Sequence, residues 1–149
     1  MLEIDNQRKL NLRLAQTPCL VEAPRALRER LARRGAQRAA GDERRHFTRF
    51  AFLTKTLLEV STTIRAIQRR PEVFAVLTTD LSRDGVAFLH VSQLFPGEVV
   101  SIWLHTGTLA CRVMRCLKHN ANCYEIGAAF ESGPQPQTWL RGLNGDPAV

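Results

Sequence analysis

The stretch that decides the fold is TTDLSRDGVAFLH, residues 78–90. It predicts the end of one strand, a tight turn and the start of a second strand, because Asp84-Gly85 is typical of short hairpin turns. Asp80 and Ser82 stand two apart just before this turn, where the first strand should end. Residues of these types either cap a turn through local hydrogen bonds or present polar groups to a ligand. Taken alone, the stretch predicts a hairpin and leaves that choice open.

The chain on both sides of this hairpin continues the same pattern. Short apolar segments separated by turn signals indicate an all-β barrel or sandwich. Turn signals lie at Pro96-Gly97, at 106–108 (TGT) and at 118–122 (KHNAN). The expected strands are 50–60, 72–81, 85–91, 99–105, 109–117 and 123–130.

The two ends of the chain have a different character. Residues 24–40 suit a helix, since Pro24 is favourable in a first helical turn and Leu27 and Leu31 share one stripe. The pattern fits a solvated, partly frayed helix or else a docking or membrane-surface helix, and residues 1–23 show no clear period. We expect a basic, partly helical N-terminal arm over 1–41. The β domain is expected over 42–149, with a short C-terminal helix formed through Trp139, Leu140 and Leu143.

Charge is concentrated in the first third of the 149-residue chain. The net charge is +7, and residues 1–49 hold 12 of the 21 basic residues but 6 of the 14 acidic ones. Such a segment suits an anionic partner. The sequence lacks a signal-peptide pattern and an apolar run long enough to span a membrane, so a cytoplasmic location is expected.

Enzyme and metal-site patterns are missing from the sequence. The four cysteines form no C-x-x-C pair, and the four histidines and scattered acidic residues match no catalytic or metal motif. We expect neither catalysis nor a metal site, and we interpret the cysteines as reduced thiols. Cys111 and Cys116 are five residues apart, which on one regular strand places them on opposite faces.

One arginine pair is distinguished by its position. The pattern R-x-x-x-R occurs at Arg45/Arg49 but also three more times, and in a chain with 18 arginines the spacing alone carries no information. Arg45 and Arg49 differ from the other copies because they immediately precede the first expected strand. Asp80 follows Arg49 by 31 residues and begins D-x-S-x-x-G, which is completed by Ser82 and Gly85.

This order of motifs resembles the signature of the PilZ domain family. The resemblance runs from about Asp42 to Ser132 and includes the run-in ERR at 43–45, the PG turn at 96–97 and G-x-x-F at Gly127 and Phe130. It implies a six-stranded antiparallel β-barrel of the PilZ type. It also implies binding of the bacterial second messenger cyclic di-GMP, with no further cofactor.

The resemblance implies a set of ligand-binding residues, namely Arg44, Arg45, Arg49, Asp80, Ser82 and Gly85. Their chemistry suits the ligand, because arginine binds phosphates and guanine acceptor edges, and a carboxylate accepts from guanine N1–H and N2–H. Gly85 would permit a positive φ at the turn and leave room for a base. Arg44 could contact phosphate, stack on a second ligand molecule or remain solvated. Asp84 is interpreted as a turn residue.

Three functions fit these patterns. The first is a cyclic di-GMP receptor, acting in processes such as motility or biofilm formation, that relays binding to an unidentified protein by ordering residues 41–49 and moving residues 1–40. The second is a PilZ-like adaptor that binds no nucleotide and contacts a pilus or flagellar protein. The third, a nucleic-acid-binding barrel, is not expected, because the β domain is nearly neutral and offers few aromatic residues for base stacking.

Overall fold

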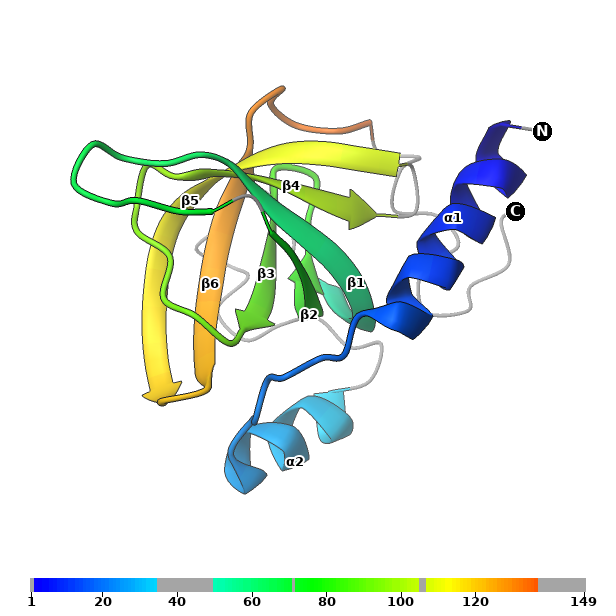
Figure 1. The fold of residues 1–149 in the computed structure, drawn as a ribbon. Coiled ribbons are helices and arrows are strands. Elements are labelled where there is room, and N and C mark those ends of the chain that lie inside the picture. Colours follow the sequence, from blue (N-terminus) through cyan, green and yellow to red (C-terminus); the bar gives the residue numbers. More distant parts are fainter. Residues whose placement is uncertain (1, 35–49, 71, 105–106, 137–149) are drawn as a thin grey trace.

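The computed structural model describes residues 2–34, 50–70, 72–104 and 107–136. Six strands close into an antiparallel barrel in the order β1-β2-β3-β6-β5-β4 (Figure 1). The predicted all-β, six-stranded architecture is therefore confirmed. The elements are α1 (Leu2–Gln16), α2 (Arg25–Arg34), β1 (Phe50–Thr62), β2 (Val73–Leu81), β3 (Gly85–His90), β4 (Val99–Leu104), β5 (Gly107–Asn120) and β6 (Cys123–Phe130).

The core fills the inside of the barrel with side chains that alternate along the strands. In β4 every second residue is buried, as expected for a strand with one face on the core. The hairpin predicted from residues 78–90 contributes to this core from β2 and β3. Its buried members are Leu58, Val76, Leu81, Val86, Phe88, Leu94, Val100, Ile102, Leu104, Cys111, Val113, Ile126, Ala128 and Phe130.

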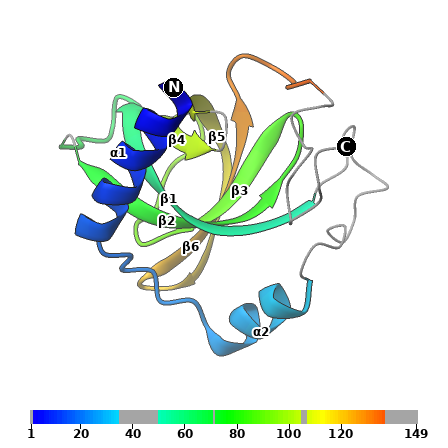
Figure 2. The same cartoon turned by 90° about the vertical axis from the view of Figure 1, so that its right-hand side faces the viewer.

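Helix α2 covers the outer face of one part of the barrel. Leu27 and Leu31 pack with Leu89 and Cys123 in a second apolar cluster, which explains why β3 is buried on both faces. Burying these side chains between helix and barrel removes apolar surface from water and stabilises the contact. Of the two alternatives for this helix, docking is confirmed (Figures 1 and 2). The part of the expected helix beyond Arg34 lies outside the described residues.

The segment before α2 is attached to the turn between β5 and β6. The amide of Glu22 donates to the carbonyl of Asn122 at 3.1 Å, and the side-chain amide of Asn120 donates to the carbonyl of Glu22 at 2.9 Å. Strand β5 continues to Asn120, so the chain break expected over 118–122 is a turn of only two residues.

Helix α1 was not predicted from the sequence. It lies beside β1 (Figure 2), where the ammonium group of Lys55 donates to the carbonyl of Leu14 at 3.3 Å. Leu10 is buried, whereas the side chain of Leu12 is 66% exposed. A stripe this narrow gives no readable helical period. Neither α1 nor α2, the helices of the described ranges, has the length and apolar character required to span a membrane.

Strand β5 contains a β-bulge that changes the direction of its side chains. Val113 pairs with Ala128, and Arg115 pairs with the next residue of β6 back along the chain, Gly127. Met114 is therefore an extra residue of β5 that has no counterpart in this register of β6. The bulge resets the alternation of inward and outward side chains.

The bulge overturns the prediction that Cys111 and Cys116 face opposite sides of one strand. Cys111 is buried in the barrel core and Cys116 packs against the same core. All four cysteines are free thiols. Burial, with a smaller contribution from the nearby charge of Glu131, raises the pKa of Cys111 to about 12, so its thiol is protonated at neutral pH.

Candidate ligand-binding site

The turn between β2 and β3 is held by its own polar groups. The amide of Ser82 donates to the carbonyl of Gly85 at 3.0 Å. The hydroxyl of Ser82 donates to a carboxylate oxygen of Asp84 at 2.5 Å, and the amide of Asp84 donates back to that hydroxyl at 3.3 Å. Asp84 therefore has the turn role expected of it, and Ser82 also stabilises the turn.

Asp80 lies two residues before this turn, inside the sheet. Its backbone pairs with Ala51 of β1 and with Ala87 of β3, and both registers are irregular at this point. The side chain is only 6% exposed. A buried carboxylate needs polar partners, since an isolated buried charge is very unfavourable. The structure thus places Asp80 as a buried residue of the sheet, two residues before Ser82.

Gly85 is required for a different reason from the one expected. Its φ is not positive; the positive-φ glycines of the described residues are Gly97, Gly107 and Gly133. A Cβ atom at Gly85 would lie 2.4 Å from the carbonyl oxygen of Ala128. The expectation of a positive φ at Gly85 is therefore wrong, and the glycine permits the close approach of β3 to β6.

A pocket of about 240 Å³ opens beside the turn and crosses three strands. We call it the turn pocket; it is lined by Ser82, Asp84, Gly85, Met114, Arg115, Gly127, Ala128 and Ala129. Its position follows from the sheet order, since β6 lies between β3 and β5. The structure therefore brings Ser82 and Gly85 of the predicted site together with residues more than 25 positions further along the chain.

Sequence reasoning missed Arg115 and Met114 as members of the site. Both are exposed, and Arg115 makes no hydrogen bond or ion pair with any residue of the described ranges. The one available signal was Gly127, because a glycine inside a strand marks a bulge or a close approach. Gly127 lies opposite the bulge, where it pairs with Arg115.

Three predicted site residues, Arg44, Arg45 and Arg49, lie outside the described residues. The described chain resumes at Phe50, whose backbone pairs with Leu81. Leu81 is the residue before Ser82, so β1 begins at the edge of the barrel where the turn pocket opens.

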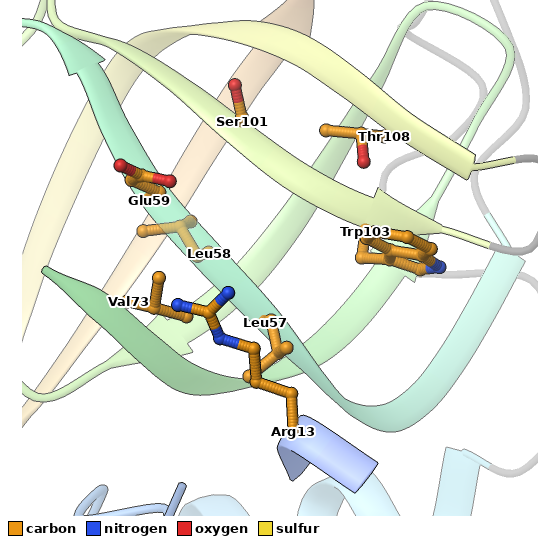
Figure 3. Close-up of a pocket in the computed structure, with 8 residues that line it drawn as sticks. All are labelled: Arg13, Leu57, Leu58, Glu59, Val73, Ser101, Trp103 and Thr108. Carbon is orange, nitrogen blue, oxygen red and sulfur yellow. The ribbon is translucent and has the colours of Figure 1, made fainter. Parts of the chain in front are cut away.

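Two other pockets lie elsewhere among the described residues. Figure 3 shows the first, a pocket of about 160 Å³ in which Arg13 extends from α1 toward Leu57 of β1 and Val73 of β2. The second, of about 480 Å³, lies between α2 and the barrel and is lined mainly by leucines such as Leu31 and Leu77. Each occurs where a helix meets the barrel, and neither contains a predicted site residue.

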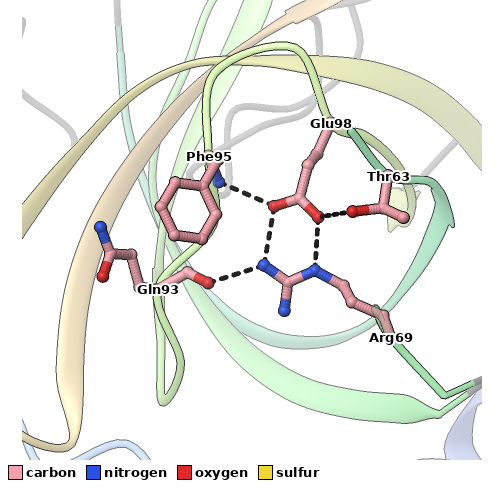
Figure 4. Close-up of polar contacts among 5 residues, drawn as sticks. All are labelled: Thr63, Arg69, Gln93, Phe95 and Glu98. Carbon is pink, nitrogen blue, oxygen red and sulfur yellow. Dashed lines mark hydrogen bonds and ion pairs between the residues drawn. The ribbon is translucent and has the colours of Figure 1, made fainter. Parts of the chain in front are cut away.

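The most tightly bound ion pair of the described residues lies at Glu98 (Figure 4). Arg69 donates to both carboxylate oxygens of Glu98, the Thr63 hydroxyl donates to one at 2.6 Å, and the Phe95 amide donates to the other at 2.7 Å. Arg69 also donates to the carbonyl of Gln93 at 3.0 Å. We call these five residues the Glu98 network. Its polar groups satisfy one another, which is typical of a structural role.

Burial and hydrogen bonding act in opposite directions on Glu98. Burial raises the pKa of its carboxyl, but hydrogen bonds from Arg69, Thr63 and Phe95 outweigh burial, and the pKa lies below its ordinary value.

Nearby His90 is fully buried. Neither ring nitrogen has a hydrogen-bond partner within the described ranges. The ring packs edge-on against the ring of Phe74, with 4.7 Å between the two ring centroids. Burial, together with the positive charge of Arg69, lowers the pKa of His90 to about 4, against the smaller opposing effect of Glu98.

No group of three or more metal-ligating side chains occurs within the described ranges. In comparisons with known proteins, no curated protein and no solved structure matches the chain significantly. The family model described as PilZ domain matches residues 43–143, a span that includes the turn pocket and all six strands. Because the match spans more than half of the chain, the chain belongs to the PilZ domain family, a family of cyclic di-GMP receptors.

Proposed function

We propose that this protein is a cyclic di-GMP receptor that binds its ligand over the turn pocket. The ligand-binding residues are Arg44, Arg45, Arg49, Asp80, Ser82 and Gly85. The observation that carries the proposal is the pairing of Phe50 with Leu81. It joins the segment bearing the arginine pair to the barrel at the edge where the turn pocket opens.

The turn pocket has the chemistry for part of this ligand. It offers a hydroxyl and carboxylate oxygens as acceptors, a guanidinium as donor and a flat floor of small residues on β6. At about 240 Å³ it is smaller than the roughly 300–1,000 Å³ typical of sites that enclose a whole small molecule. The pocket fits one base of the ligand, and Arg45 and Arg49 bind the phosphates above it.

The position of the arm provides a route from ligand to partner. Residues 41–49 are the last part of the segment 35–49, which connects α2, packed on the barrel, to β1. Ligand binding orders this connection against the turn pocket and moves residues 1–40, changing the surface that a partner protein meets. Such a shift requires the ligand to bind one arm position more tightly than the other.

Calorimetric titration of the full chain with cyclic di-GMP tests the binding itself. We expect saturable binding to the folded protein, and cyclic di-AMP as the matched ligand should bind far more weakly. A folded sample that releases no heat with cyclic di-GMP would overturn the proposal. It would then favour the nucleotide-free adaptor on the same fold.

Single alanine substitutions locate the site. Arg45→Ala, Arg49→Ala and Asp80→Ala should each weaken binding by about 10- to 100-fold, because each removes a hydrogen bond to a charged group. Arg65→Ala is the matched control, since Arg65 belongs to another R-x-x-x-R copy and is exposed. Wild-type affinity in all three site variants would place the ligand elsewhere.

Small-angle scattering of the full chain with and without ligand tests the relay. The arm should adopt a different position only when cyclic di-GMP is bound. Arg49→Ala should show no such change at the same ligand concentration. An unchanged scattering profile at saturation would argue against a moving arm.

A further inference from the structure

The β5 bulge points two neighbouring side chains into the turn pocket. In a regular strand, successive residues face opposite sides of the sheet, so only one of Met114 and Arg115 could line a surface pocket. The extra residue at the bulge lets both do so. Bulges are frequent next to functional sites because they redirect side chains in this way.

Gly127 lies opposite the bulge and provides a place for Arg115. A Cβ atom at Gly127 would lie 2.6 Å from Nε and 3.0 Å from Cγ of Arg115. The arginine side chain therefore runs across the glycine, in space that any other residue would occupy. Because the guanidinium makes no ion pair with a described residue, its donors remain available in the pocket.

The pocket has a different polarity on each side. Ser82 and Asp84, at the β2–β3 turn, provide oxygen acceptors, whereas Arg115, on β5, provides only donors. Arg115 extends over Gly127, and Ala129 of β6 also lines the pocket. A flat ring lying between the Arg115 side chain and the β2–β3 turn thus has one edge toward acceptors and the other toward a cation.

Guanine matches this polarity. One of its edges carries the N1–H and N2–H donors, and the other carries the O6 and N7 acceptors, which arginine binds through two parallel hydrogen bonds. Adenine offers a donor where guanine has O6, so it cannot accept both bonds from one arginine.

We propose that Arg115 is a ligand-binding residue that reads the O6/N7 edge of one guanine, and that Gly127 is the positioning residue that holds it there. This inference rests on the proposed binding of cyclic di-GMP. It adds to that function a determinant of base specificity, located on β5, 30 residues after the last residue of the D-x-S-x-x-G motif.

The first test compares Arg115→Ala with Arg112→Ala by calorimetry against cyclic di-GMP. Arg115→Ala should raise the Kd by about 10- to 100-fold, because it removes a two-pronged charged contact. Arg112→Ala removes the same charge from the same strand, but Arg112 pairs with Glu131 and does not line the pocket, so it should leave the Kd unchanged. Equal effects of the two variants would overturn the assignment.

Gly127→Ala provides an independent variant that keeps the charge. The new methyl group displaces the Arg115 side chain and should raise the Kd in the wild-type background. In the Arg115→Ala background it should have little further effect, because there is then no side chain to displace. Additive effects of the two substitutions would show that Gly127 does not act through Arg115.

An altered ligand identifies the edge that Arg115 contacts. Cyclic di-GMP carrying 7-deazaguanine has a C–H group in place of N7 and should bind wild-type protein about 2- to 10-fold more weakly, as expected for one lost hydrogen bond. Arg115→Ala should not distinguish the two ligands. If it distinguishes them as well as wild type does, Arg115 contacts another part of the ligand and the assignment fails.

The outcomes separate this inference from the proposed function. Wild-type protein that does not bind cyclic di-GMP contradicts the function itself. Wild-type binding that survives Arg115→Ala contradicts only the role of Arg115. Circular dichroism and thermal unfolding of each variant verify that it is folded before its affinity is interpreted.

Discussion

The Glu98 network and the turn pocket each combine a carboxylate, an arginine and a turn, yet they differ in what remains available. Glu98 is 0% exposed, and both its oxygens accept hydrogen bonds from protein groups (Figure 4). Arg115 in the turn pocket is exposed and makes no ion pair with a described residue. An arginine whose donors are used within the protein stabilises the fold, whereas one held ready beside a pocket can bind a ligand.

The same contrast separates the R-x-x-x-R copy at 65–69 from the copy that we propose binds the ligand. Arg69 belongs to the copy at 65–69, and the structure uses it to neutralise Glu98 inside the protein. Spacing along the chain does not reveal such a partner. The burial of Glu98 reveals it, because a buried carboxylate without a cation is strongly destabilising.

The largest expected effect is a loss of stability in the Glu98 network. Arg69→Ala should reduce the free energy of unfolding by about 3–5 kcal/mol, because it leaves Glu98 buried without its cation. Urea unfolding measures the loss. Affinity for cyclic di-GMP, measured where the variant is still folded, should be unchanged. A folded Arg69→Ala variant with weakened binding would show that the two regions are not independent.

The pH dependence of stability should reveal His90, next to the Glu98 network. The pKa of His90 is lowered from 6.5 to about 4 by burial, so between these values the unfolded chain binds a proton that the folded protein does not. Stability should be constant above pH 6.5 and fall by about 3 kcal/mol in total as pH drops to 4. Glu98, whose pKa is lowered on folding, adds a further loss only as the pH falls toward and below its ordinary pKa of 4.5, where the unfolded carboxyl takes up a proton that the folded one does not.

Chemical denaturation at several pH values measures this slope, and His90→Leu is the matched variant. Its stability should vary much less between pH 6.5 and 4.5, because the group that takes up the proton on unfolding is gone. An equal slope in wild type and His90→Leu would assign the dependence to other groups.

Two glycines of the turn pocket should respond in opposite ways. Gly85→Ala places a methyl group against the backbone of Ala128 and should cost about 1–3 kcal/mol of stability. Gly127→Ala meets only the flexible side chain of Arg115, so it should cost less stability and act mainly on binding. Thermal unfolding and calorimetry of both variants separate the two effects. Equal destabilisation by both would contradict the distinction.

The smallest effect is expected at Arg112. Its ion pair with Glu131 at 2.7 Å is exposed, and such pairs contribute about 0–1 kcal/mol. Arg112→Ala should therefore leave the melting temperature close to that of wild type. A loss as large as that of Arg69→Ala would mean that exposure does not separate structural from surface arginines here.

Several features of the barrel were predictable because they depend on local chemistry. The hairpin at 78–90 was readable from Asp84-Gly85 and from the apolar residues on each side, and the other strands from alternation between turn signals. The role of Asp84 in the turn was also local, since Ser82 and Asp84 bond to each other. Helix α1 was missed because few of its apolar side chains are buried: Leu10 is buried, whereas Leu12 is exposed.

The predicted reason for Gly85 was wrong because it was sought within the turn. The constraint comes from Ala128, 43 residues away in sequence, whose carbonyl lies where a side chain would be. The faces of Cys111 and Cys116 were wrong for a related reason. Strand periodicity predicts faces only while the strand is regular, and pairing with β6 introduces a bulge between the two cysteines.

The sequence by itself therefore determined the strand order along the chain, the polar turn and the motif residues that suit a nucleotide. The tertiary structure alone decided which arginines are used internally and which remain available. Barrel closure buries Glu98 beside Arg69, and the bulge opposite Gly127 places Arg115 in the turn pocket. The physical reason is that burial and pairing between distant strands, unlike turn chemistry, depend on residues that are not neighbours in the chain.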